Sequence, residues 1–131
     1  MIVIDSSYTL ALTMPDESRP ASVDAVLAER LLAPTIWPLE LANALRNGLR
    51  RGRLREAQTD GLCARIDELA VEVLGAVSSQ PRRHLDLART HDLTPYDALY
   101  LDLALQRRAG LATCDAALAA AAARAGVAVF S

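Results

Sequence analysis

The stretch Met1–Ser7, MIVIDSS, decides the fold of the chain. Ile2–Ile4 is an uninterrupted apolar run that is rich in β-branched side chains. Such a run predicts a short strand buried on both faces, as strands are in a parallel sheet with helices on either side. Asp5 follows at once, so a carboxylate stands at the carboxyl end of this strand.

Segments of two kinds alternate along the rest of the chain. Short apolar runs predict strands, whereas apolar residues at three- and four-residue steps predict helices. The predicted strands are Ile2–Ile4, Ala33–Ile36, Val71–Leu74, Leu111–Cys114 and Val127–Phe130. The predicted helices are Tyr8–Met14, Ala21–Leu32, Pro38–Arg50, Leu54–Leu69, Gln80–His91, 95–110 and Ala116–Ala125. Strands that alternate with helices or helix pairs indicate a parallel sheet covered on both faces.

The length and composition of the chain indicate a single domain. A chain of 131 residues can bury one core without disulfides or a structural metal. Hydrophobic residues make up 52% of the sequence but aromatic residues only 4%, which favours helices packed on a sheet. We therefore expect an α/β protein, a single-domain α/β/α sandwich over residues 1–131 with a parallel sheet of four to five strands.

The charged residues exclude several classes of function. The formal net charge is −2, so no overall positive charge attracts nucleic acid, and any basic site is local. All 14 basic residues are arginine. The absence of lysine excludes a Walker A phosphate loop and Schiff-base chemistry, while arginine leaves bidentate phosphate binding open.

The cysteines and the first residues favour a cytoplasmic protein. Cys63 and Cys114 form no CxxC or zinc-ligand spacing, so we expect buried thiols in a reducing cytoplasm. The first residues form a strand rather than a signal peptide, and no run reaches the roughly 18 apolar residues of a membrane span. We therefore expect neither secretion nor a membrane protein.

The stretch Leu93–Ala104, LTPYDALYLDLA, places a carboxylate on an apolar helix face. Thr94 is a suitable N-cap, and Pro95 suits the first helical position. At about 100° per residue, Asp97 shares a face with leucine and alanine side chains, whereas Asp102 is turned toward solvent. Because an ionised carboxylate on a buried face is costly without a partner or a cation, we expect a partner for Asp97.

Four acids stand at comparable places in the predicted fold. Asp5 and Asp115 follow strands, and Glu40 and Asp97 lie in the first turns of helices. Each has an ordinary explanation as a helix cap or a first-turn acid. Together they would face the same rim of a parallel sheet, where ligands bind near a topological switch point.

A divalent cation would explain such a group of acids. Converging carboxylates raise one another's pKa, and a hard cation removes that conflict. Oxygen ligands without histidine or thiolate favour Mg²⁺ or Mn²⁺. A site of this kind polarises a phosphoryl oxygen and lowers the pKa of a bound water, so it suits hydrolysis of phosphodiester bonds.

Four segments of the chain resemble PIN-domain ribonucleases, and specifically the VapC-like toxins of toxin–antitoxin systems. They are VIDSS (Val3–Ser7), PLELANAL (Pro38–Leu45), LTPYDALYLDLA (Leu93–Ala104) and LATCD (Leu111–Asp115), and they extend over nearly the whole chain. The resemblance implies a compact α/β/α fold and a Mg²⁺- or Mn²⁺-dependent endoribonuclease whose activity a VapB-like antitoxin inhibits. It also implies the identity of the catalytic and metal-binding acids, which are Asp5, Glu40, Asp97 and Asp115.

Two details near the last acid bear on this resemblance. Thr113 matches the hydroxyl residue that stands two positions before the last acid in the family. Many relatives carry an aromatic residue about four positions after that acid, whereas this chain has alanines and Leu118. We therefore expect the local packing near Asp115, rather than the chemistry, to differ from that of these relatives.

Two polar residues are candidates for supporting roles. Ser7 either holds a water or a phosphate at the metal site or caps the following helix. Asn43 either orients Glu40 through a hydrogen bond or is an ordinary surface amide.

The candidate binding surfaces are one basic segment and two apolar helices. Arg46, Arg50 and Arg51 form either a solvated helix end or contacts for RNA phosphates. Helices Tyr8–Met14 and Ala21–Leu32 offer surfaces for a homodimer or an antitoxin helix, unless their apolar side chains belong to the core.

Two other classes of protein stay open. A catalytically inactive PIN-like interaction domain would carry the same acids as helix caps only. Another Mg²⁺-dependent phosphoryl-transfer α/β domain would also place aspartates at strand ends. A receiver domain, however, needs a later lysine, and a haloacid-dehalogenase-like phosphatase needs Asp-x-Asp where Asp5 is followed by two serines. The nuclease hypothesis requires the four carboxylates to lie together.

Overall fold

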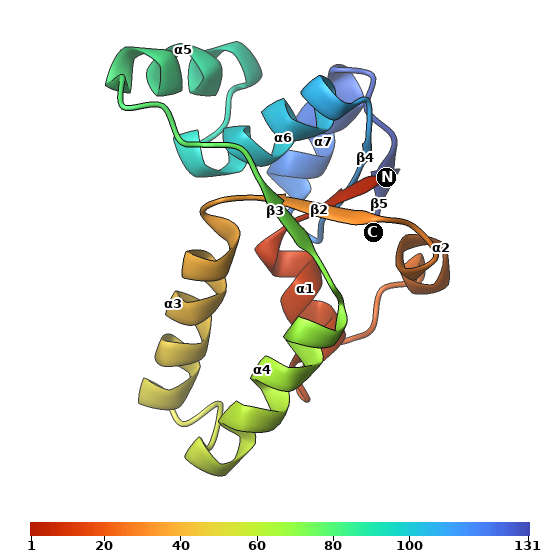
Figure 1. Ribbon diagram of the computed structural model, residues 1–131, viewed down its shortest axis with the longest axis vertical. Coiled ribbons are helices and arrows are strands. Elements are labelled where there is room, and N and C mark those ends of the chain that lie inside the picture. Colours follow the sequence, from red (N-terminus) through yellow and green to blue (C-terminus); the bar gives the residue numbers. More distant parts are fainter.

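The computed structural model describes all 131 residues and shows a five-stranded parallel sheet with helices on both faces (Figure 1). The strands are β1 (Ile2–Ile4), β2 (Leu31–Pro34), β3 (Glu72–Leu74), β4 (Gly110–Ala112) and β5 (Val129–Phe130). Their order in the sheet is β3-β2-β1-β4-β5. The predicted α/β/α fold with a parallel sheet is thus confirmed.

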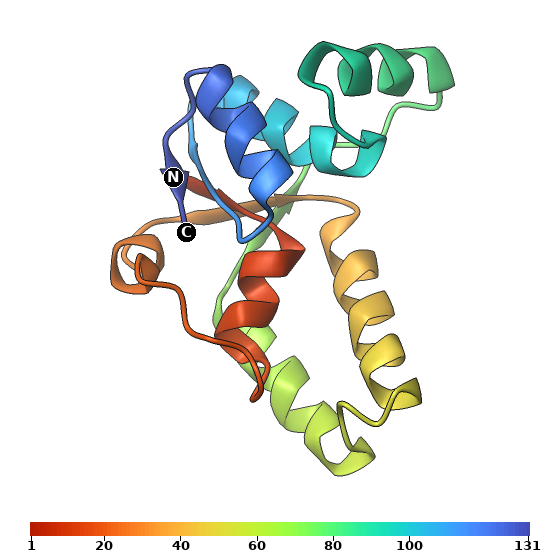
Figure 2. The ribbon, with the colours of Figure 1, turned by 180° about the vertical axis from the view of Figure 1, so that it is seen from behind.

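The helices form a layer on each side of the sheet (Figures 1 and 2). They are α1 (Ser6–Thr13), α2 (Val23–Leu27), α3 (Trp37–Arg50), α4 (Thr59–Glu68), α5 (Pro81–His91), α6 (Pro95–Arg107) and α7 (Ala116–Arg124), with the 3-10 helix η1 (Glu56–Gln58) before α4. Helices α6 and α7 lie on one face of the sheet, and α1 and α2 lie on the other. Helices α3 and α4 extend away from the sheet beside α1, while α5 packs on α6.

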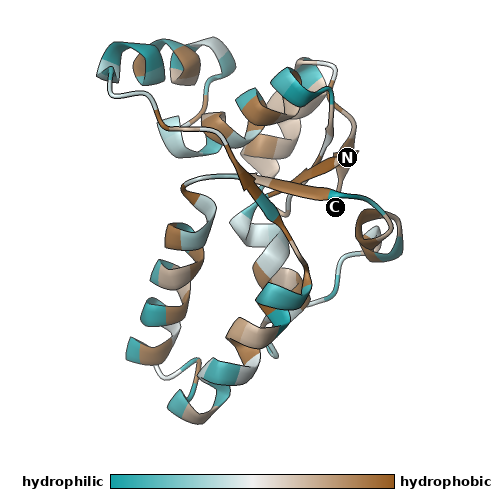
Figure 3. Cartoon of the chain, in the orientation of Figure 1, coloured by the Kyte–Doolittle hydropathy of each residue, from teal (hydrophilic) through white to brown (hydrophobic).

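The central strand is buried because its side chains alternate between the two layers. Val3 belongs to the main core with residues of α3, α4, α6 and α7. Ile2 and Ile4 pack instead with Tyr8 of α1 and Val26 of α2. None of the three strand residues is more than 2% exposed, and Figure 3 shows the hydrophobic residues concentrated in the strands at the centre. The apolar run therefore forms the doubly covered strand that the sequence predicts.

The helix predicted over Ala21–Leu32 is wrong in its second half. Helix α2 ends at Leu27, and Leu31 begins β2. Leu31 packs in the cluster under α1 and α2, whereas Leu32 packs in the main core, as alternate residues of a strand do. The sequence shows helical spacing through this region because Leu31, a buried residue of β2, lies four positions after Leu27 of α2. The strand predicted over Ala33–Ile36 accordingly starts two residues too late.

The structure differs from two further expectations. The helix predicted from Leu54 begins only at Thr59, although Leu54 itself is buried in the core. Cys63 and Cys114 are exposed free thiols, so the expectation of buried cysteines is wrong. The structure contains no helix with the length and apolar character needed to cross a membrane.

The strand order creates a topological switch point between β1 and β4. From β1 the chain continues to β2 and β3 on one side, then crosses to β4 and β5 on the other. In such sheets the crevice outside the carboxyl ends of the strands at the switch point binds ligands. Asp5 follows β1, and 113–115 follow β4, so residues of both central strands meet at this crevice.

Candidate active site

Asp5 is a buried carboxylate at the carboxyl end of β1, with only 4% of its surface exposed. As the N-cap of α1, its Oδ1 accepts the backbone N–H of Tyr8 at 2.8 Å. The Ser7 hydroxyl donates to this carboxylate at 2.8 Å, and the Thr113 hydroxyl donates to Oδ2 at 2.5 Å. No ion pair of the protein includes Asp5. The fold thus buries an acid among hydrogen-bond donors without a cationic partner.

Burial changes the ionisation of Asp5. Loss of hydration raises the pKa of Asp5 to about 6, although the three hydrogen bonds lower it, and the charge of Asp97 raises it further. A carboxyl group with a raised pKa gains most from a nearby cation, because the cation replaces the lost hydration of the charged form.

Ser7 and Thr113 join the turn after β1 to the turn after β4. The Ser7 hydroxyl accepts the backbone N–H of Cys114 at 2.9 Å while donating to Asp5. The Thr113 hydroxyl accepts the backbone N–H of Asp115, also at 2.9 Å. Ser7 therefore links two strand ends and does not cap α1, since Asp5 is the N-cap.

Asp115 stands where the sequence predicts it, at the start of α7. Its Oδ1 accepts the backbone N–H of Leu118 at 2.8 Å, which makes it the N-cap of the helix. Leu118 is fully buried in the main core, so this turn packs against the core without an aromatic residue.

Asp97 lies in the first turn of α6 and is half-buried. Its backbone N–H donates to the Thr94 hydroxyl at 3.2 Å, which confirms Thr94 as the N-cap. Burial raises the pKa of Asp97, and the charges of Asp115 and Glu40 raise it further. Carboxylates from α3 and from the start of α7 therefore lie within electrostatic reach of Asp97.

Glu40 occupies the first turn of α3, as predicted, but its partner differs from the expected one. The hydroxyl of Tyr100 on α6 donates to Glu40 Oε1. Asn43 is exposed, and its side chain forms no hydrogen bond. Tyr100, rather than Asn43, therefore orients Glu40. Sequence reasoning missed Tyr100, and the available signal was a tyrosine one helical turn after Asp97.

The four acids fit a hard divalent cation by their chemistry. All the donors are oxygen atoms, and the raised pKa of Asp5 and Asp97 reflects charge that a cation would balance. No three histidine, cysteine, aspartate or glutamate side chains converge closely enough to hold a metal ion together, so the expectation that the four carboxylates lie together is not met. Mg²⁺ does not require such a group, because it usually keeps several waters and binds one or two carboxylates.

Arg46, Arg50 and Arg51 lie at the opposite end of α3 from the acids. All three are exposed, and none forms an ion pair. The helical rise separates Glu40 and Arg50 by about 15 Å along the axis. The structure therefore does not bring these arginines to the acids, but it leaves their charges open to solvent.

The apolar surface of the protein differs from the expected one. Helix α1 turns Tyr8 and Ala11 into the interior, so it contributes mainly to the core. The two most exposed large hydrophobic side chains are Leu39 at 71% and Tyr96 at 62%, each immediately preceding a candidate acid. Exposed apolar side chains thus adjoin the acid group.

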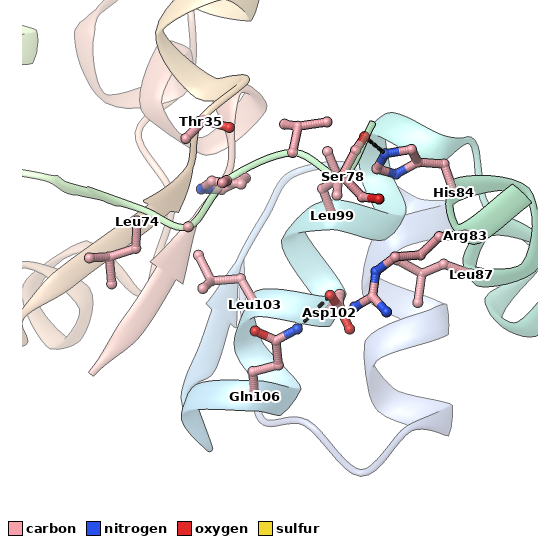
Figure 4. A pocket seen from close by; sticks show the side chains of 14 residues that line it. Thr35, Leu74, Ser78, Arg83, His84, Leu87, Leu99, Asp102, Leu103 and Gln106 are labelled. Carbon is pink, nitrogen blue, oxygen red and sulfur yellow. Dashed lines mark hydrogen bonds between the residues drawn. The ribbon is translucent and has the colours of Figure 1, made fainter. Parts of the chain in front are cut away.

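A separate cavity of about 100 Å³ lies between the end of β3, α5 and α6 (Figure 4). At its wall, His84 Nε2 lies 2.8 Å from the carbonyl oxygen of Ser78, and Gln106 donates to Asp102 at 2.8 Å. None of the four candidate acids lines this cavity. Asp102 is therefore satisfied by a neighbour on its own helix, away from the candidate site.

Comparison with known proteins adds independent information. The PIN domain family matches residues 2–124. Ribonuclease VapC3 of Pyrobaculum aerophilum is 32% identical over 121 residues, which cover 90% of this chain and 92% of that protein. The crystal structure of PAE2754 from Pyrobaculum aerophilum has a TM-score of 0.69 at 25% identity, covering 92% of this chain and 83% of that chain. FitAcB from Neisseria gonorrhoeae shares the fold, with a TM-score of 0.57 at 22% identity over 100% of this chain and 97% of that chain.

Proposed function

The chain belongs to the PIN domain family of VapC-like ribonucleases, and from this premise we propose that it is a Mg²⁺- or Mn²⁺-dependent endoribonuclease. The observation that carries the proposal is the buried carboxylate of Asp5 at the switch point of the sheet, within electrostatic reach of Asp97. Burying an acid without a cationic side chain is costly, and a divalent cation at the site offsets that cost.

The chain's own residues would divide the work at this site. Among Asp5, Glu40, Asp97 and Asp115, one or two carboxylates would bind the cation directly and the others would act through its waters. The cation, when bound, polarises a phosphoryl oxygen and lowers the pKa of water. The Ser7 and Thr113 hydroxyls donate hydrogen bonds to Asp5 and keep its carboxylate in one orientation. A fixed orientation matters because a ligand that needs no reorganisation binds its cation more tightly.

The arginines at the end of α3 would serve the RNA chain. Arg46 and Arg50 are four residues apart on one side of α3, toward the end of the helix that is opposite Glu40. Exposed arginines that form no ion pair keep their full charge for phosphate groups, which they bind bidentately. We place the RNA strand along α3, with its scissile phosphate at the acids.

The proposal extends to the cellular role. The VapC-like relationship supports a toxin of a toxin–antitoxin pair, with RNA as substrate and a VapB-like antitoxin as inhibitor. A homodimer belongs to the same proposal, and Leu39, the most exposed large hydrophobic side chain, is the one that an interface would cover with most gain.

A catalytically inactive interaction domain is the second candidate. It is favoured by one observation, namely that Asp5 and Asp115 both act as N-caps and so have structural roles without any cation. An interaction domain of this kind would not cleave RNA. Removing the Asp97 carboxylate, which caps no helix, would then change no activity.

Cleavage of RNA by purified protein distinguishes the two candidates. The wild type is expected to cut a mixed single-stranded RNA pool in Mg²⁺ and to stop in EDTA, and Asp97→Asn is expected to be inactive. The matched control is Asp102→Asn on the same helix, which should cut like the wild type, because the Asp102 side chain bonds only Gln106. Equal cleavage by both variants would point to a contaminating nuclease and contradict the proposal.

A further inference from the structure

The Tyr100 hydroxyl is a buried polar group whose partner belongs to the candidate active site. The Tyr100 side chain is 1% exposed and packs in the main core. Its hydroxyl donates to Oε1 of Glu40, a residue 60 positions earlier in the chain. This bond connects α6, which carries Asp97, to α3, which carries Glu40.

The chemistry of this contact fixes the roles of its two members. A tyrosine hydroxyl loses its proton only at about pH 10, so the Tyr100 hydroxyl carries its proton at neutral pH. A protonated phenol that faces a carboxylate oxygen acts as the donor. Among the side-chain hydrogen bonds of the protein, this is the only one that Glu40 makes, and Oε2 of Glu40 accepts none.

We propose that Tyr100 is a positioning residue that holds Glu40 toward the other acids and leaves Oε2 to bind the cation. This inference rests on the proposed function. A glutamate side chain in the first turn of a helix is flexible, and a buried donor on a rigid neighbouring helix restricts it to one arrangement. Hydrogen bonds of this kind to a ligating carboxylate typically raise metal affinity by about 10–100-fold.

The matched experiment removes one oxygen atom from each of two tyrosines on α6. Tyr100→Phe deletes the hydroxyl that bonds Glu40, while Tyr96→Phe deletes an exposed hydroxyl that makes no hydrogen bond. Mn²⁺ binding is followed by electron paramagnetic resonance of the free ion, and folding by circular dichroism and urea unfolding. We expect about 10–100-fold weaker binding in Tyr100→Phe and unchanged binding in Tyr96→Phe.

The outcomes separate this inference from the function on which it rests. If Tyr100→Phe folds and binds Mn²⁺ like the wild type, Tyr100 has only a structural role and the inference is overturned. If the wild type itself binds no Mn²⁺, the proposed function fails first, and the inference fails with it.

A second measurement is an NMR titration of the wild-type protein with Mg²⁺. The chain has three tyrosines, so wild-type protein labelled with ¹³C at the tyrosine Cζ gives three resonances. Mg²⁺ is expected to shift the Tyr100 resonance, because the cation withdraws charge from the carboxylate that its hydroxyl contacts, and to leave the Tyr96 resonance in place. A Tyr100 resonance that stays unchanged at saturating Mg²⁺ would overturn the inference.

Discussion

The Thr113 hydroxyl donates a hydrogen bond of 2.5 Å to Oδ2 of Asp5, a residue 108 positions earlier in the chain. The bond connects the carboxyl ends of β1 and β4, the two strands on either side of the switch point. The same hydroxyl accepts the backbone N–H of Asp115. One buried oxygen atom therefore fixes two of the four candidate acids relative to each other.

Replacing Thr113 by valine keeps the shape of the side chain and removes this oxygen. We expect Thr113→Val to lower the free energy of unfolding by about 2 kcal/mol, because a hydrogen bond to a buried charged group is lost. Thr113→Ser retains the hydroxyl and serves as the control. Urea unfolding at pH 7.5 measures both variants, and equal losses in the two would show that the hydroxyl contributes nothing.

The raised pKa of Asp5 predicts how the stability of the metal-free protein depends on pH. The folded protein holds a proton on Asp5 up to about pH 6, whereas the unfolded chain releases it near pH 4. The stabilisation from this proton is complete below the unfolded pKa and is lost as the pH rises through the folded pKa. Lowering the pH from 7.5 to 5.0 should therefore add about 1.4 kcal/mol to the free energy of unfolding.

Asp5→Asn tests the source of this pH dependence. Urea unfolding in EDTA at the two pH values should show the added stability in the wild type and a smaller gain in the variant. A variant with the same gain as the wild type would assign the effect to other groups, such as Asp97, whose pKa is also raised.

The sequence predicted the positions of the acids well because each depends on a local rule. A β-branched run followed by an aspartate predicts a buried strand with an acid at its end, and Asp5 lies there. Thr94 and Asp115 are N-caps because short polar side chains satisfy the free N–H groups of a first helical turn. Local rules also misled, since Leu31 continues the period of α2 although it belongs to β2.

The contacts between the acids and their partners could not be predicted in this way. The bond from Tyr100 to Glu40 depends on how α6 and α3 pack across the end of the sheet, and no spacing in the sequence encodes that register. The same holds for Ser7, whose partner Cys114 becomes a neighbour only once β1 and β4 pair. Long-range packing therefore supplied the partners that hold the acids in place.

The arginines of α3 give a prediction about RNA binding. If Arg50 contacts a phosphate, Arg50→Ala should weaken binding of single-stranded RNA and reduce the slope of log affinity against log salt by about 0.7. Arg107→Ala removes the same charge from the end of α6 farthest from Asp97 and should leave the slope unchanged. Binding is measured by fluorescence anisotropy in Ca²⁺ over a range of salt concentrations. If the two variants show the same slope, Arg50 does not contact RNA.

The central claim is that Asp5, Glu40, Asp97 and Asp115 share a divalent cation. The direct measurement is anomalous X-ray scattering from crystals of the protein grown with Mn²⁺. We predict an anomalous peak at the carboxyl ends of β1 and β4, in direct contact with a carboxylate oxygen of one or two of these four acids, with waters completing the shell. Saturating Mn²⁺ without a peak at these acids, or with peaks only elsewhere on the surface, would contradict the account.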